Sequence, residues 1–130
     1  MAFQCRDAAD PELSGRYDPA TIFEALHDMS YPVDVLWTAR GLLSEAVACS
    51  SPTSGPPSAS RSTPATWSAS TTAFSVLHCL PVGRVGEDAA GTGTVMREGT
   101  VRGYAEQAGF AACDVAPIEN DFWRFYLMTP

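Results

Sequence analysis

Apolar residues in the first third of the chain predict two strands and a helix. Ala2–Cys5 is a candidate for a short strand, and Tyr17–Leu26 is predicted to be an apolar strand. Pro19 weakens the second prediction, because proline has no N–H to donate to a strand ladder. Pro32 is favourable in the first turn of a helix, so a helix is predicted over Pro32–Leu43. The apolar residues that fall near one face of this helix are Val33, Leu36, Trp37 and Leu43.

The last part of the chain predicts a second helix and further strands. Four residues at i, i+3, i+4 and i+7 predict a helix over Thr100–Ala108, which Gly109 ends. The remaining segments are an apolar run of ambiguous period (Phe74–Leu80), a glycine-rich loop (Gly83–Gly93) and two candidate strands (Cys113–Ile118 and Phe122–Met128). This order of elements favours an α/β layer structure.

Between these parts lies a block of unusual composition, Ser44–Ala73. Ser, Thr, Ala, Pro and Gly occupy 25 of its 30 positions. Such a segment buries too little apolar surface to offset the entropy of ordering it. The sequence therefore predicts a low-complexity, disordered block at 44–73, between ordered portions at 1–43 and 74–130.

Charge and hydropathy exclude several classes of partner. The 130 residues carry a formal net charge of −7 with only eight Lys and Arg, so phosphate neutralisation cannot drive nucleic-acid binding. No run of 18 apolar residues is present, so no membrane span is expected. The segment Met1–Asp10 does not have the pattern of a secretory leader, and a cytoplasmic location is expected.

The cysteines and histidines give no recognisable metal motif. In a reducing compartment Cys5, Cys49, Cys79 and Cys113 are expected to be free thiols. The sequence contains no CxxC pair and only two histidines, His27 and His78, so no metal site is predicted.

Several stretches resemble the C-terminal half of class I S-adenosylmethionine-dependent methyltransferases, of the bacterial type that acts on small molecules. The resemblance covers roughly 100 of the 130 residues and rests on FEALHDM (23–29), FSVLHCLP (74–81) and IENDFWRFY (118–126), which occur in this order. It implies an α/β fold with part of a Rossmann-like sheet, from the third strand to the seventh. S-adenosylmethionine is the implied cofactor and a small molecule the implied acceptor, and a homodimer of the full-length parent is compatible with the family.

The resemblance assigns roles to individual residues near the cofactor. It places Phe3–Cys5 on the third strand of the family's sheet, with Asp7 and Ala8 against the adenine. Tyr17–Glu24 would be the fourth strand, and Glu24 and Ala25 at its mouth would lie near the methionine part of the cofactor.

Other residues are candidates for the chemistry itself. His27 would face the methyl-transfer cleft as a general base for a substrate hydroxyl, with Asp28 orienting its ring. The alternative for His27 is a structural histidine that caps a turn. His78 and Cys79 are candidates for the substrate pocket, and the alternative for both is the hydrophobic core.

Two departures from the family pattern limit what this chain can do. The GxGxG loop and the acidic residue for the ribose hydroxyls are absent, and the Ser/Pro/Ala-rich block replaces the fifth strand. The block is compatible with a reading-frame error: back-translated with GC-rich codons and read in another frame, Glu45–Pro57 can give GRGVLVADE and Thr63–Ala73 can give DPGDLVERLHYG. We therefore expect a truncated methyltransferase fragment that is inactive alone. The alternatives are a non-catalytic interaction module of two small lobes joined by a flexible linker, and a sheet completed by a separate chain.

Overall fold

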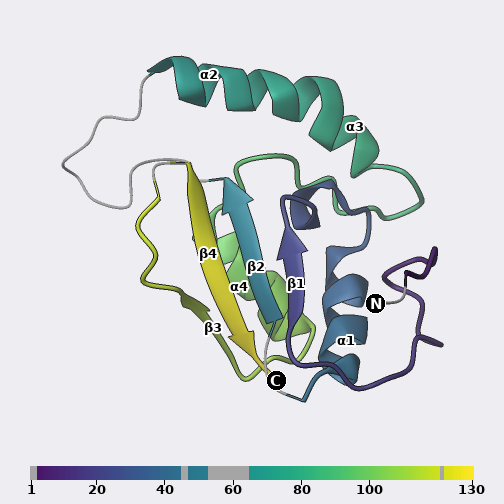
Figure 1. The fold of residues 1–130 in the computed structure, drawn as a ribbon. Helices are drawn as coiled ribbons and strands as arrows, with labels where there is room; N and C mark the ends of the chain where they lie inside the picture. Colours follow the sequence, from purple (N-terminus) through teal and green to yellow (C-terminus); the bar gives the residue numbers. More distant parts are fainter. Residues whose placement is uncertain (1–2, 45–46, 53–64, 121) are drawn as a thin grey trace.

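The computed structural model describes residues 3–44, 47–52, 65–120 and 122–130, and these form a four-stranded sheet with helices. The strands are β1 (Ala20–Phe23), β2 (Val47–Pro52), β3 (Ala112–Val115) and β4 (Trp123–Thr129). Their order across the sheet is β1-β2-β4-β3 (Figure 1). β1 and β2 are parallel, whereas β4 is antiparallel to both β2 and β3. The α/β fold class expected from the sequence is confirmed.

Two helices cover one face of the sheet. Helix α1 (Pro32–Leu42) follows β1, and α4 (Glu98–Gln107) precedes β3; α4 lies behind the sheet in Figure 1. The strands alternate as half-buried strands should, so that Ile22 packs against the core while Phe23 is 60% exposed. The principal members of the core are Leu26, Leu36, Leu43, Met96, Val101, Ala105, Phe110, Tyr126 and Met128.

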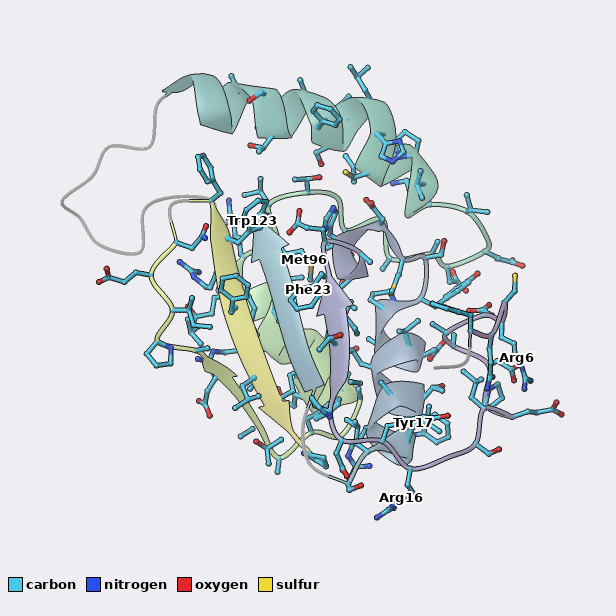
Figure 2. All side chains as sticks on the ribbon, viewed as in Figure 1. Arg6, Arg16, Tyr17, Phe23, Met96 and Trp123 are labelled. Carbon is cyan, nitrogen blue, oxygen red and sulfur yellow. The ribbon has the colours of Figure 1, made fainter. Side chains whose placement is uncertain are left out.

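The opposite face of the sheet carries no helix among the described residues. Phe23 pairs across β2 with Phe125, and Trp123 lies two residues from Phe125 along β4, so Phe23 and Trp123 share this face. Figure 2 labels both, and they are 60% and 37% exposed. Leu127, on the same face, is 46% exposed. The sheet is therefore covered on one side only within the described part of the chain.

A continuous helical segment crosses the edge of the sheet where β1 and β2 end (Figure 1). It comprises α2 (Ala65–Phe74), a π-helical turn η2 (Ser75–Cys79) and α3 (Leu80–Val82). Thr71, Ser75 and Cys79 are buried at a spacing of four residues, whereas Leu77 is 80% exposed. The apolar run Phe74–Leu80 is thus helical. The face that it buries carries the small side chains of Ser75 and Cys79, and Leu77 lies on an exposed face. Within the described residues, no helix has both the length and the apolar character needed to cross a membrane.

Most elements predicted at the two ends of the chain are confirmed, with shifted boundaries. α1 begins at Pro32 as expected, but its buried face differs: Val35 and Leu36 are buried, whereas Trp37 is 57% exposed. The segment Tyr17–Leu26 contributes only Ala20–Phe23 to the sheet. Gly109 has φ 85° and ends α4, as the sequence predicted.

The prediction of a strand over Ala2–Cys5 is wrong for Phe3–Cys5, the part that the structure describes. These residues are not in a strand, and Phe3 is 91% exposed. A strand needs a neighbour to satisfy its backbone groups, and no described strand lies beside this segment. The edge strand β1 pairs only with β2 in the described part of the chain.

The structure also corrects the prediction of disorder for parts of the block 44–73. Val47–Pro52 forms β2, and Ala65–Ala73 belongs to α2. β2 is an interior strand, because it pairs with β1 on one side and with β4 on the other. Hydrogen bonds to both neighbouring strands satisfy the backbone N–H and C=O groups of β2, and these bonds do not depend on its side chains. A segment with a weak strand sequence can therefore be held in the sheet. The block therefore supplies a strand rather than replacing one; residues 53–64 lie outside the described part.

Candidate functional site

The chemistry-bearing side chains lie where β1 ends. Glu24 follows β1 with φ 52°, and His27 and Asp28 form the short 3-10 helix η1 (Leu26–Asp28) directly after it. In open α/β sheets, ligands bind beyond the carboxyl ends of parallel strands, and β1 and β2 are the parallel pair here. The local turn therefore brings His27 and Asp28 to the edge of the sheet at which binding sites form.

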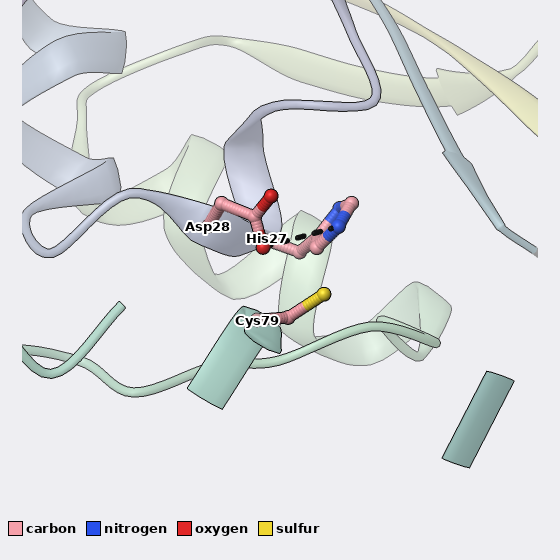
Figure 3. A group of neighbouring side chains, drawn as sticks. All are labelled: His27, Asp28 and Cys79. Atoms are coloured by element: carbon pink, nitrogen blue, oxygen red, sulfur yellow. Dashed lines mark ion pairs between the residues drawn. The ribbon is translucent and has the colours of Figure 1, made fainter. Parts of the chain in front are cut away.

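His27, Asp28 and Cys79 form a compact cluster at this edge (Figure 3). One candidate ligand atom from each residue lies within 4.8 Å of the other two. His27 and Cys79 are 4% and 5% exposed, and Asp28 is half-buried. Nε2 of His27 lies 3.4 Å from Oδ1 of Asp28, which forms an ion pair when the ring is protonated. The structure thus unites three residues that the sequence had placed in two separate roles.

Two glycines allow the element that carries Cys79 to approach His27 and Asp28. The N–H of Gly83 donates to the Cys79 carbonyl at 2.8 Å, and a Cβ at Gly83 would lie 3.2 Å from that oxygen and 3.5 Å from the His27 carbonyl. The N–H of Gly93 donates to the His27 carbonyl at 3.2 Å. Gly93 has φ +74°, and a Cβ there would lie 2.5 Å from Oγ of Ser75. The glycine-rich loop Gly83–Gly93 is therefore hydrogen-bonded to the backbone of both segments that carry the cluster.

Burial dominates the electrostatics of the cluster. It raises the pKa of the Cys79 thiol; a hydrogen bond with Thr94 opposes this shift, and Asp28 adds to it. Burial also raises the pKa of the Glu24 carboxyl, while a hydrogen bond with Trp123 and the charge of His27 act in the opposite direction. Nδ1 of His27 and Oδ1 of Asp28 are buried and make no hydrogen bond with the described residues. A buried polar atom without a hydrogen-bond partner costs free energy, so each such atom calls for a structural or functional explanation.

A cavity of about 600 Å³ lies on the other side of β1 from β2. Its lining comes mainly from β1, from α1 and from the segment before β1, and it is predominantly apolar. Ala8 and Ala25 both line it, so the structure brings together two of the residues expected to bind the cofactor. Met29 and Tyr17 also line it, and the sequence gave no reason to single them out.

Two other candidate residues lie outside these features. Asp7 is exposed and its Oδ1 accepts the N–H of Ala9 at 2.9 Å, so the carboxylate serves a local turn. His78 is exposed on η2, although the adjacent Cys79 is buried. Thr94, which the sequence did not single out, hydrogen-bonds to Sγ of Cys79. No spacing rule could have revealed that contact, because Thr94 lies in a loop without a repeating pattern.

Comparison with known proteins identifies the fold. None of the protein-family models matches the sequence, and neither does any curated protein sequence. A structure from Nostoc punctiforme, assigned as an O-methyltransferase, gives a TM-score of 0.65 at 15% identity over 98% of this chain. An O-methyltransferase family protein from Burkholderia thailandensis gives 0.59 at 20% identity, also over 98% of this chain. The chain has part of a methyltransferase fold.

The match covers nearly all of this chain but only part of each solved structure. This chain spans 35% and 34% of the length of those two proteins. It spans 48% of the magnesium protoporphyrin IX methyltransferase from Synechocystis PCC 6803, which was solved with bound SAH and gives a TM-score of 0.50 at 14% identity. More than half of each of these methyltransferase structures therefore has no counterpart in this chain.

Proposed function

We propose that this chain is the C-terminal portion of an S-adenosylmethionine-dependent methyltransferase that acts on a small molecule. In this proposal His27 accepts the proton of the acceptor and Asp28 orients its ring. The chain alone is inactive, because the portion that would hold most of the cofactor is not in it.

The position of His27 carries this proposal. A buried imidazole with an unpartnered Nδ1 stands directly after the parallel edge strand β1. It does so in a chain of which 98% superposes on methyltransferase structures. A histidine so placed can form a hydrogen bond with a substrate hydroxyl and take its proton, as a general base must. The structural alternative, a histidine that caps a turn, would need a hydrogen bond from a ring nitrogen to the backbone. Nδ1 makes no hydrogen bond in the described part, and Nε2 lies 3.4 Å from Oδ1 of Asp28.

The residues present do not make a complete cofactor site. The cavity beside β1 could take an apolar part of a ligand, since Ala8, Ala25 and Met29 line it. Ribose hydroxyls need a carboxylate, and neither Asp7 nor Glu24 lines the cavity. The carboxylate of Asp7 already accepts a hydrogen bond from Ala9. The chain alone is therefore expected to bind S-adenosylmethionine weakly or not at all.

The alternative of two small lobes on a flexible linker does not fit the architecture. Residues from both flanks of the block contribute to one sheet, because β2 joins β1 to β4. They also share one core, in which Leu36 of the first flank and Tyr126 of the second are members. A single folding unit is the better description of the described residues.

The test compares this chain with the longer protein encoded when the reading frame is followed upstream. Calorimetry measures the binding of S-adenosylhomocysteine, and this measurement does not require the methyl acceptor to be known. The longer protein should bind it saturably, whereas this chain should not. Saturable micromolar binding by the chain alone would overturn its inactivity, and failure of the longer protein to bind would overturn the assignment as a methyltransferase.

A further inference from the structure

Three different metal-ligating side chains meet in the cluster of His27, Asp28 and Cys79. Each offers one ligand atom, and these atoms lie within 4.8 Å of one another. Figure 3 shows Cys79 reaching the cluster from η2, while His27 and Asp28 come from the turn after β1. The sequence did not predict that these three side chains meet, because Cys79 and His27 belong to segments far apart in the chain.

The spacing of the ligand atoms suits a tetrahedral ion. Nε2 of His27 and Oδ1 of Asp28 are 3.4 Å apart, and that oxygen makes no hydrogen bond with the described residues. Two ligands of a tetrahedral zinc, bound at about 2.0–2.3 Å, lie roughly 3.3–3.8 Å from each other. Closing the remaining separation to Sγ needs a movement of about 1 Å, which a rotation of the side chains can supply.

A buried polar atom of the cluster without a hydrogen-bond partner supports a bound cation. The His27 side chain is 5% exposed, and its Nε2 lies 3.4 Å from Oδ1 of Asp28. That Oδ1 is buried and makes no hydrogen bond with the described residues. A buried acceptor with no partner costs about 1–3 kcal/mol, and a bound cation would remove that cost for the atom it engages.

The charge of the cluster selects the kind of ion. A thiolate from Cys79 and the carboxylate of Asp28 together carry two negative charges, and the neutral imidazole of His27 adds none. A divalent cation would neutralise the buried site. A set of sulfur, nitrogen and oxygen ligands favours zinc over magnesium or calcium, which prefer oxygen alone.

We propose that His27, Asp28 and Cys79 bind a zinc ion, with a water molecule in the fourth position. On binding, the Cys79 thiol releases its proton to solvent and its sulfur forms the bond to the metal. The hydroxyl of Thr94, already hydrogen-bonded to Sγ, would then donate to the thiolate as an outer partner. This proposal differs from the sequence-based expectation of no metal site.

This site does not rest on the proposed function. Zinc binding needs neither the cofactor nor an acceptor, so it can be measured on this chain alone. Zinc bound by Nε2 of His27 and Oδ1 of Asp28 would remove the carboxylate that orients the ring, so it would inhibit methyl transfer in a longer protein. The binding test below does not depend on that outcome.

The test uses the intact chain, freed of metal by a chelator and titrated with zinc against a chromophoric competitor. The expected result is one zinc per chain with a dissociation constant in the micromolar range or tighter. Cobalt serves as a second probe, because a cobalt–thiolate bond gives a charge-transfer absorption that a site without sulfur lacks.

Matched variants locate the site. Cys79→Ser should weaken zinc binding by at least about tenfold and remove the cobalt–thiolate absorption, because even the loss of an outer partner costs that much in metal sites. Cys113→Ser, at another buried cysteine, and Cys5→Ser, at an exposed one, should change neither. His27→Gln should weaken binding, whereas His78→Gln, at an exposed histidine, should not.

Two results would overturn the proposal. One is the absence of saturable zinc binding by the chain, with circular dichroism showing that it is folded. The other is binding that survives Cys79→Ser but is lost in Cys5→Ser or Cys113→Ser, which would place the zinc elsewhere. Circular dichroism of Cys79→Ser separates a lost ligand from a lost fold, and Asp28→Asn offers a second ligand variant at a half-buried position.

Discussion

The backbone N–H of Gly93 donates a hydrogen bond to the carbonyl of His27 at 3.2 Å. This bond ties the glycine-rich loop to the turn after β1, and Thr94, the next residue, is hydrogen-bonded to Cys79. One short stretch of loop therefore holds both halves of the candidate site together. Gly93 can do so because its φ of +74° is accessible to glycine and because it has no Cβ to meet Ser75.

Gly93→Ala should destabilise the protein by about 1–3 kcal/mol. The alanine would have to keep a backbone conformation that is strained for any residue with a side chain. Its Cβ would also lie 2.5 Å from Oγ of Ser75. Gly41→Ala, on the exposed side of α1 where nothing lies within 4 Å, should stabilise it by about 0.5–1 kcal/mol. Urea denaturation measures both. Equal midpoints for the two variants would show that the loop is not packed as described.

The face of α1 that packs against the core can be tested with neighbouring residues. Leu36 is fully buried, so Leu36→Ala should lower the free energy of unfolding by about 2–5 kcal/mol. Trp37 is 57% exposed, so Trp37→Ala should change it by no more than about 0.5 kcal/mol. Chemical denaturation of both variants decides the matter. A larger loss for Trp37→Ala would mean that the helix packs by the face that the sequence suggested.

Stability should fall at alkaline pH in part because of Cys113. Burial raises the pKa of this thiol above its ordinary value; Arg102 opposes the shift, and Asp114 and Glu98 add to it. The unfolded chain then loses the thiol proton at a lower pH than the folded protein does. Stability from this group is complete below the unfolded pKa and is lost as pH rises through the folded one.

The measurement is the free energy of unfolding between about pH 8 and pH 10, for the protein and for Cys113→Ala. The decline with pH should be shallower in the variant. Burial also raises the pKa of Tyr126, so a residual slope should remain. Identical slopes in the two proteins would show that Cys113 is not held as a buried thiol.

Local patterns predicted the parts of the fold that depend on local physics. Pro32 correctly predicted the start of α1. The spacing of Val101 and Ala105 predicted α4, and Gly109 predicted its end. Predictions were wrong where long-range pairing decides. Val47–Pro52 has a weak strand sequence, yet it is held between two partners, whereas Phe3–Cys5 has no described partner and is not a strand.

The candidate site was predicted in part for the same reason. His27 and Asp28 are neighbours at the end of a predicted strand, so their proximity follows from the sequence. Their contact with Cys79 depends on how η2 packs over the sheet edge, and no local pattern encodes that. Asp7 was chosen by resemblance and His78 as a candidate for the substrate pocket, and the structure shows both to be exposed.

The central claim is that this chain is one portion of a methyltransferase whose gene encodes the rest. Sequencing the gene together with the region upstream tests it most directly. The account predicts an in-frame segment upstream that encodes a GxGxG loop after a strand. Stop codons in every upstream frame would contradict it.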